Sequence, residues 1–314
     1  MKADQASLSI GPVLFHWNAE KWRDFYFRIA DEAPVESVYV GEVVCSKRTP
    51  FTEPYYQEVA ERLQKGGKKV VFSTLSEVMI KRDRQIVAGM CALEDCEIEA
   101  NDGAALYHLS GRPHRVGPFI NVYNEDTLAF LTSKGAVHFC LPPELPADAL
   151  AVLGDKAAAL QVTLEAQVYG RMSLALSARC YHARAHGRVK DSCQFVCEED
   201  PDGMDLKTLD GNEFLAINGI QTLSHGCLNL IGELGEMRKV GISTFRLSPH
   251  NHDIVQVAKL FRDVLDGAMA ADEALAELAQ IGLSVPFVNG FYHKQEGYRW
   301  VRPAAAAKQS AAKA

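Results

Sequence analysis

The stretch "SARCYHARAHGRVKDSCQFVC", residues 177 to 197, holds three cysteines among Arg, Lys and His side chains, where no hydrophobic period can be read. They are Cys180, Cys193 and Cys197, and a fourth cysteine of interest, Cys45, stands in "GEVVCSKR". The thiolate is the form of cysteine that binds metals, and nearby cations favour it. Four thiolates suit either a zinc ion or an iron-sulfur cluster.

The spacing of these cysteines favours a cluster over zinc. Structural zinc sites usually use pairs of ligands two to four residues apart, and only Cys193 and Cys197 form such a pair. A cubane is larger, can be held by widely separated ligands, and carries negative charge that the neighbouring cations offset. We therefore expect Cys45, Cys180, Cys193 and Cys197 to hold a 4Fe-4S cluster, with zinc as the alternative.

The other four cysteines lie in apolar or helical surroundings and are expected to pack in the core: Cys91, Cys96, Cys140 and Cys227. Cys140 lies near the end of an expected strand, where an inward-pointing thiol could face a substrate cavity. None of the five histidines His182, His186, His225, His250 and His252 can be assigned a catalytic role from the sequence. The motifs H-E-x-x-H, G-x-S-x-G, G-x-G-x-x-G and the P-loop are absent, so the catalytic residues stay unassigned.

The composition excludes several classes of protein. Of the 314 residues 47% are hydrophobic and 23% charged, which is typical of a globular protein. A formal net charge of -7 argues against a nucleic-acid-binding protein. No signal peptide and no apolar run of about 18 residues is evident, which predicts a cytoplasmic protein without a membrane span. In that reducing compartment the cysteines are expected as free thiols or metal ligands.

Eight short apolar runs, most of them separated by segments with helical spacing, predict the architecture. The runs cover residues 10–15, 37–42, 69–75, 96–102, 118–124, 136–144, 161–170 and 243–249. Asn18 and Thr52 are expected to cap the first two helices, and Gly66 to end the second. Alternating strands and helices favour a (β/α)8 barrel of the TIM type, possibly incomplete, with an open doubly wound sheet as the alternative.

The domain organisation follows from the same pattern. We expect one barrel-like domain over residues 1–303 and a flexible, low-complexity tail over 304–314. Residues 171–243, between the seventh and eighth runs, break the alternation and are expected to form an irregular, cluster-binding insertion.

A parallel barrel places its active site at the carboxyl ends of its strands, so the polar residues that end the apolar runs are candidates. They are Glu42, Thr74, Asn101, Asp102, Asn121, Asn124, Glu144, Glu165, Gln167 and Tyr169. Thr74, Asp102 and Asn124 are better explained as helix caps. Cys45 follows the second run and the other three cysteines follow the seventh, so all four are expected at the same rim.

The run "EAQVYGRMSLALSARC" resembles the signature of the U-32 peptidase family. Six positions match that signature: Glu165, Gly170, Met172, Ser177, Arg179 and Cys180. Four depart from it, with Tyr169 in place of the usual His, Arg171 in place of a small residue, Ser173 in place of the first Cys and Ala178 in place of a Gly.

The segments "GEVVCSKR", "SARCYHAR", "KDSCQFVC", "INGIQTLS" and "RLSP" are similar to the ubiquinone-biosynthesis branch of that family, from about residue 8 to 300. The resemblance implies a 4Fe-4S cluster on Cys45, Cys180, Cys193 and Cys197. It also implies a heterodimer with a UbiU-like family member that hydroxylates ubiquinone precursors without oxygen, and contact with that precursor or its lipid carrier. A U-32-type peptidase or other hydrolase, and a scaffold or oxygen-sensing subunit that carries the cluster, are the alternative hypotheses.

Overall fold

The computed structural model describes residues 6–302, and its centre is a closed barrel of eight parallel strands. The barrel strands are β1 (Ser7–Ile10), β2 (Ser37–Val40), β3 (Lys69–Ser73), β4 (Glu97–Ala100), β5 (His114–Val116), β6 (Ala136–Leu141), β7 (Thr163–Leu176) and β11 (Ile242–Leu247). The barrel closes because β11 pairs in parallel with both β7 and β1. The predicted (β/α)8 barrel is therefore confirmed, and the open sheet is excluded. The expected tail over 304–314 lies outside the described residues.

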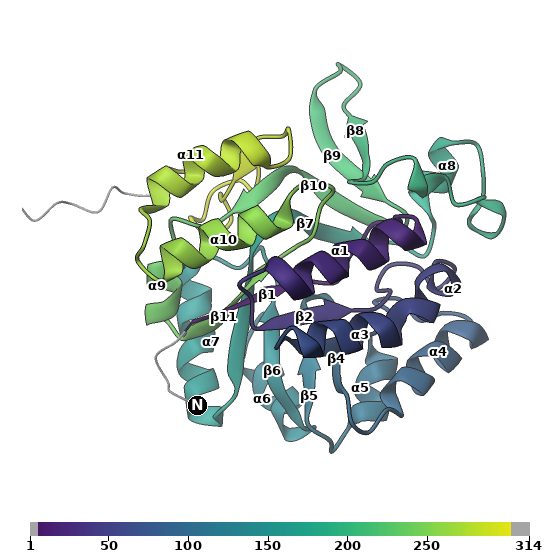
Figure 1. Ribbon diagram of the computed structural model, residues 1–314, viewed down its shortest axis with the longest axis horizontal. Helices are drawn as coiled ribbons and strands as arrows, with labels where there is room; N and C mark the ends of the chain where they lie inside the picture. The colour runs from purple at the N-terminus through teal and green to yellow at the C-terminus, as the bar shows by residue number, and fades with distance from the viewer. Residues whose placement is uncertain (1–5, 303–314) are drawn as a thin grey trace, which may run out of the picture.

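Helices surround the barrel and bury their apolar faces against it (Figure 1). The principal ones are α1 (Ala19–Glu32), α3 (Tyr56–Lys65), α4 (Lys81–Cys91), α5 (Gly103–Leu109), α6 (Glu125–Ser133), α7 (Ala147–Leu160), α10 (Ile254–Leu265) and α11 (Ala271–Ile281). Asn18 caps α1 as predicted, since its side chain accepts a hydrogen bond from the backbone N–H of Lys21 at 2.8 Å. Within residues 6–302 no helix is both long and apolar enough to cross a bilayer.

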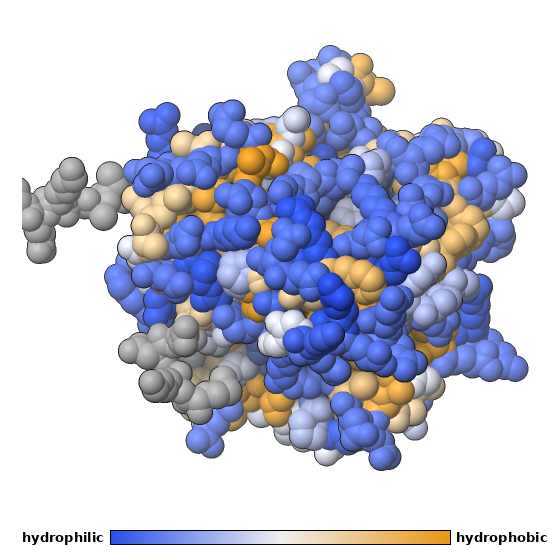
Figure 2. Space-filling view, in the orientation of Figure 1, coloured by the Kyte–Doolittle hydropathy of each residue, from blue (hydrophilic) through white to orange (hydrophobic). Residues whose placement is uncertain are grey.

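The strand β7 is much longer than the others and leaves the barrel at its carboxyl end. Its residues 169–176 pair antiparallel with β10 (Gln221–Asn229), and β9 (Glu213–Asn218) and β8 (Met204–Lys207) follow at the edge of the same sheet. The short β12 (Phe287–Val288) pairs with the end of β10. The hairpin of β8 and β9 projects from the body, and its tip carries apolar surface (Figure 2).

The segment 171–243, expected to be irregular, thus contains mostly regular structure. Besides the strands it includes α9 (Leu234–Lys239), and only residues 177–203 form an irregular loop, which carries the short helix α8 (Tyr181–Ala185). The sequence pattern concealed the strands because β8 and β9 are largely exposed and lack a continuous apolar face.

Two local predictions were wrong. The fifth strand is His114–Val116, whereas residues 118–120 of the predicted run form a 3-10 turn. Pro118 has no N–H to donate to a sheet and favours the start of such a turn. Thr52 does not cap the second long helix, because it ends the one-turn helix α2 (Thr49–Thr52), and α3 begins only at Tyr56. Gly66 ends α3 as predicted.

The interior of the barrel is charged at its centre. The guanidinium of Arg246 on β11 lies 2.6 Å from a carboxylate oxygen of Glu99 on β4 and 2.6 Å from one of Glu165 on β7. Its plane lies over the ring of Tyr39, whose hydroxyl donates to Glu165 at 2.7 Å. His138 also contacts Glu165, at 3.0 Å. These contacts join β2, β4, β6, β7 and β11 through buried polar groups.

Substitution of Glu165 by Gln is expected to lower the free energy of unfolding by about 3 kcal/mol, because it leaves a buried guanidinium with half of its counter-charge. The comparison is Glu213→Gln on β9, where the 42% exposed carboxylate pairs with the 55% exposed Lys207 on β8. That variant should lose less than about 1 kcal/mol. Urea unfolding at pH 7 measures both, and equal losses would contradict the central role of Glu165.

The same carboxylate should make stability fall in acid. Burial alone would raise the pKa of Glu165, but the charge of Arg246 and the hydrogen bond with His138 outweigh it and hold the pKa well below the ordinary 4.5. The unfolded chain therefore binds a proton here at higher pH than the folded chain does. The contribution is complete above pH 4.5 and is lost as the pH falls below that value. In Glu165→Gln this part of the acid dependence should vanish.

Candidate metal centre at the barrel rim

The four cysteines expected to meet at the rim line one pocket, here called the cysteine pocket. Cys45 comes from the loop after β2, and Cys180, Cys193 and Cys197 come from the loop 177–203 after β7. Both loops follow the carboxyl ends of barrel strands. The topology of the barrel, and not nearness in sequence, brings Cys45 to the other three.

Local hydrogen bonds set the shape of both loops. The carboxylate of Glu42 accepts from the backbone N–H of Val44 at 2.8 Å and of Cys45 at 2.9 Å, which turns the chain just after β2. The two loops are joined by Lys47, whose ammonium donates to the carbonyl oxygens of Lys190 at 2.7 Å and Asp191 at 3.0 Å. Cys45 is therefore held against the loop that carries the other cysteines.

The spacer between Cys193 and Cys197 is a tight turn. Gln194 and Phe195 adopt left-handed backbone conformations with φ of 50° and 55°. Such conformations are uncommon for residues other than glycine and persist where the surrounding structure imposes them. Cys180 caps α8, and its sulfur accepts from the N–H of Ala183 at 3.4 Å. All three thiols of this loop are thus fixed by backbone geometry.

The distances among the sulfur atoms bear on the choice of metal. Among residues 6–302 two groups of three metal-binding side chains have donor atoms within 4.8 Å of one another, and neither contains a cysteine. Tetrahedral zinc with a Zn–S distance of about 2.3 Å would hold its sulfurs about 3.8 Å apart. A larger cubane holds them farther apart. The four sulfurs line one pocket, and such a donor set suits either an iron-sulfur cubane or zinc.

The cysteine pocket also contains a buried positive charge. Arg48 is fully buried there and donates to the backbone oxygen of Leu14 at 2.9 Å and to the side chain of Asn218 at 3.0 Å. Within the described chain no carboxylate oxygen lies within 4.0 Å of its guanidinium, and its Nε has no hydrogen-bond partner. A buried cation is strongly disfavoured without negative charge nearby, and here the buried carboxylate of Glu42 supplies it from beyond 4.0 Å.

The metal-free thiols add no negative charge beside Arg48. Burial raises the pKa of Cys45, Cys180 and Cys197, and the charge of Arg48 offsets this effect only in part. Burial therefore disfavours the thiolate form in the metal-free pocket. Metal binding would convert them to thiolates and place negative charge beside Arg48. The four cysteines and the buried guanidinium beside them fit an anionic, thiolate-bound group.

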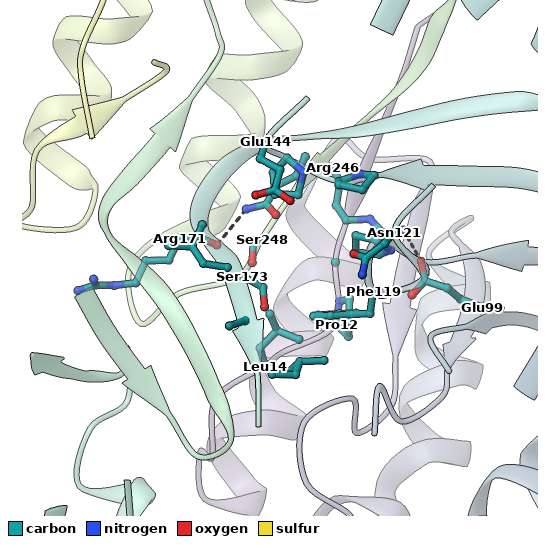
Figure 3. A pocket seen from close by; sticks show the side chains of 18 of the residues that line it. Pro12, Leu14, Glu99, Phe119, Asn121, Glu144, Arg171, Ser173, Arg246 and Ser248 are labelled. Atoms are coloured by element: carbon teal, nitrogen blue, oxygen red, sulfur yellow. Dashed lines mark hydrogen bonds and ion pairs between the residues drawn. The ribbon is translucent and has the colours of Figure 1, made fainter. Parts of the chain in front are cut away.

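The other predicted rim residues cap helices, join the ion cluster inside the barrel or line a second pocket. Asp102 and Asn124 cap α5 and α6, as expected, whereas Thr74 accepts a hydrogen bond from the N–H of Asn101. Glu165 belongs to the ion cluster inside the barrel. Three of the candidates, Asn121, Glu144 and Gln167, line a second pocket at the mouth of the barrel, with a volume of about 320 Å³. We call it the mouth cavity (Figure 3).

The remaining cysteines are buried or half-buried, and two of the histidines lie close to carboxylates. Cys91, Cys140 and Cys227 are buried and Cys96 is half-buried, and Cys140 does not line the mouth cavity. His182 lies 2.8 Å from Asp200 beside the cysteine pocket, and His250 lies 3.2 Å from Asp202. The sequence reasoning overlooked Arg246 as a central residue, although a charged side chain within the apolar run 243–249 was a signal of an interior ion pair.

The position of Arg48 depends on Gly219, which leads to a prediction. Gly219 has a φ of +61°, and a Cβ there would lie 2.9 Å from Nη2 of Arg48. Gly219→Ala should therefore both strain the backbone, by about 1 kcal/mol, and displace the guanidinium. Gly211→Ala is the matched control, because its φ is +85° and a Cβ there meets no atom within 4 Å.

Urea unfolding should show a larger loss for Gly219→Ala than for Gly211→Ala, and alkylation of the four thiols by iodoacetamide should accelerate only in Gly219→Ala. If the two variants behave alike, Gly219 does not hold Arg48 in the cysteine pocket.

Comparison with known proteins places the chain in a family. The model of peptidase family U32 matches residues 17–302. Among solved structures, phospho-2-dehydro-3-deoxyheptonate aldolase from Thermotoga maritima is 12% identical with a TM-score of 0.35, over 90% of this chain and 71% of that one. The Bacillus cereus spore cortex-lytic enzyme SleL is 8% identical with a TM-score of 0.28, over 82% of this chain and 75% of that one. Structural likeness this low carries no argument about function. The family match spans most of the chain, and the chain therefore belongs to peptidase family U32.

Proposed function

We propose that this chain is a 4Fe-4S protein of the UbiV branch of the family, and that it acts with a UbiU-like partner in the oxygen-independent hydroxylation of ubiquinone precursors. The observation that carries the proposal is the cysteine pocket, in which Cys45, Cys180, Cys193 and Cys197 surround one space beside Arg48. The segments that contain these cysteines also resemble that branch. The substrate and the partner rest on the resemblance alone.

The residues of the pocket have distinct parts in this proposal. The four cysteines would hold the cluster, which when bound supplies one-electron redox chemistry. Arg48 balances its charge, and Glu42 and Lys47 fix the loop that carries Cys45. Apolar residues cover the pocket from the barrel side, since Leu14, Val43, Val44 and Ile220 form a buried cluster against Cys45 and Cys180. That cover would keep water from the cluster.

The hydrolase alternative is less well supported by the same site. An activated cysteine nucleophile needs a lowered pKa or an adjacent general base. Burial instead raises the pKa of Cys45, Cys180 and Cys197. His182, the histidine that lines the pocket, lies 2.8 Å from Asp200, and a pairing of this kind orients an imidazole without removing it as a base. The raised pKa values weigh against a cysteine nucleophile in the metal-free pocket.

The direct test is the content of iron and acid-labile sulfide in protein purified without oxygen. About four irons and four sulfides per chain are expected in the unaltered protein and a large loss in Cys45→Ala and in Cys180→Ala, because each removes one ligand. Cys96→Ala is the control, since this half-buried cysteine lies outside the pocket. Zinc in place of iron, or full iron in both ligand variants, would contradict the proposal.

A second test concerns Arg48. Replacing Arg48 with Gln removes a buried positive charge next to the cluster and should lower its midpoint potential by on the order of 100 mV. Arg48→Lys keeps the charge and should shift the potential much less. Potentiometric titration of both variants, with iron measured on the same samples, gives the comparison. Equal potentials in the Gln and Lys variants at full iron content would mean that Arg48 does not act through its charge.

A further inference from the structure

The mouth cavity is a second possible ligand site, distinct from the cysteine pocket. It opens where the carboxyl ends of the barrel strands meet, and its volume of about 320 Å³ falls in the range of small-molecule sites. Residues from the loop after β1, the end of β4, the loops after β5 and β6, and strands β7 and β11 contribute to its walls. Figure 3 shows their side chains gathered around one space.

The charges of the mouth cavity disfavour an anionic ligand. Two arginines line it, but the guanidinium of Arg246 is already shared by Glu99 and Glu165. The side chain of Arg171 points away from the cavity (Figure 3) and donates to the backbone oxygens of Ser224 and His225. Neither lining arginine therefore offers an unpaired cation. A carboxylate or phosphate would face the carboxylate of Glu144 without an unpaired cation to offset it.

The uncharged polar groups of the cavity include acceptors for a ligand that donates hydrogen bonds, beside Asn121, Ser173 and Ser248, whose side chains can donate or accept. The amide nitrogen of Gln167 is used by the backbone oxygens of Tyr169 and Arg171, at 3.3 Å and 3.1 Å, so its amide oxygen is the group that can bind a ligand. Glu144, which accepts a hydrogen bond from Tyr123 at the rim, is a further acceptor. A ligand hydroxyl can donate to both kinds of oxygen.

Much of the remaining cavity wall is apolar. Prolines, leucines and one phenylalanine form it: Pro12, Pro118, Pro142, Pro143, Leu14, Leu174, Leu176 and Phe119. Rigid apolar walls with a few acceptors suit a flat hydrocarbon ring that bears hydroxyl groups. They are a poor match for an ammonium ion, which would lose its hydration against these walls.

The mouth cavity adjoins the cysteine pocket. Leu14, Phe119 and Leu176 line the cavity, whereas Cys45, Cys180 and Ile220 line the pocket. All six belong to one apolar cluster. A ligand in the cavity would therefore be separated from the four thiols by packed side chains and not by bulk water.

We propose that the mouth cavity binds an uncharged, hydroxyl-bearing aromatic ring of the phenol class, so that this chain itself contacts the ring substrate. The identification of this ligand as the substrate rests on the proposed function, whereas its binding depends only on the barrel. Ligand binding can therefore be measured in protein with and without iron. A failure of the cluster proposal can then be distinguished from a failure of the ligand proposal.

The experiment compares three phenols that differ in charge: phenol, which is neutral, 4-hydroxybenzoate, which is anionic, and tyramine, which is cationic. Saturation-transfer NMR titrations on both the iron-containing and the iron-free protein should show phenol binding with a dissociation constant in the millimolar range, as expected for so few atoms. The other two should bind at least about tenfold more weakly. Ser173→Phe, which fills the cavity from β7, should abolish phenol binding in both forms.

Glu144→Lys tests the role of charge. This variant introduces an ammonium at the rim and should raise the affinity for 4-hydroxybenzoate above that for phenol. The control is Glu20→Lys on the exposed surface of α1, which makes the same change in net charge. It should leave the order of the three affinities unchanged. Three results would overturn the proposal. They are phenol binding that persists in Ser173→Phe, no phenol binding below about 10 mM in either form, and tighter binding of 4-hydroxybenzoate or tyramine than of phenol by the unaltered protein.

Discussion

The charged centre of the barrel is the interaction on which the rest of the structure depends. Arg246 lies between Glu99 and Glu165, and the three residues belong to β11, β4 and β7. Because a buried guanidinium must keep its partners, these strands cannot shift relative to one another without a large cost in free energy. The loops that follow β2 and β7 start from this fixed frame. The same ion cluster leaves the floor of the mouth cavity without a free cation.

Arg48 presents the opposite electrostatic case. Both arginines are buried, but Arg246 has two carboxylate partners, whereas Arg48 has only neutral hydrogen-bond acceptors within the described chain. An anionic, thiolate-bound cluster would add negative charge beside this group to that of the more distant Glu42. Four cysteines line the pocket around Arg48. The proposed cluster therefore accounts for the cation and for the cysteines together, which scattered core thiols would not.

Much of the fold could be predicted from the sequence, because barrel strands that are buried on both sides appear as apolar runs. The prediction failed at residues 118–124, where an apolar run forms a 3-10 turn after the three-residue strand β5. It also failed to anticipate strands β8 and β9, since their exposed side chains follow no apolar period. The four cysteines could be grouped from the loops they occupy. The pairing of Arg246 with Glu99 and Glu165 could not, because it joins residues 81 and 147 positions apart.

The account depends most on the group that the four cysteines hold. Native mass spectrometry of the intact chain, prepared without oxygen, measures it in one step. The account predicts an added mass of about 350 Da, equal to four irons and four sulfides. An added mass of about 65 Da, equal to one zinc ion, or none at all would contradict it.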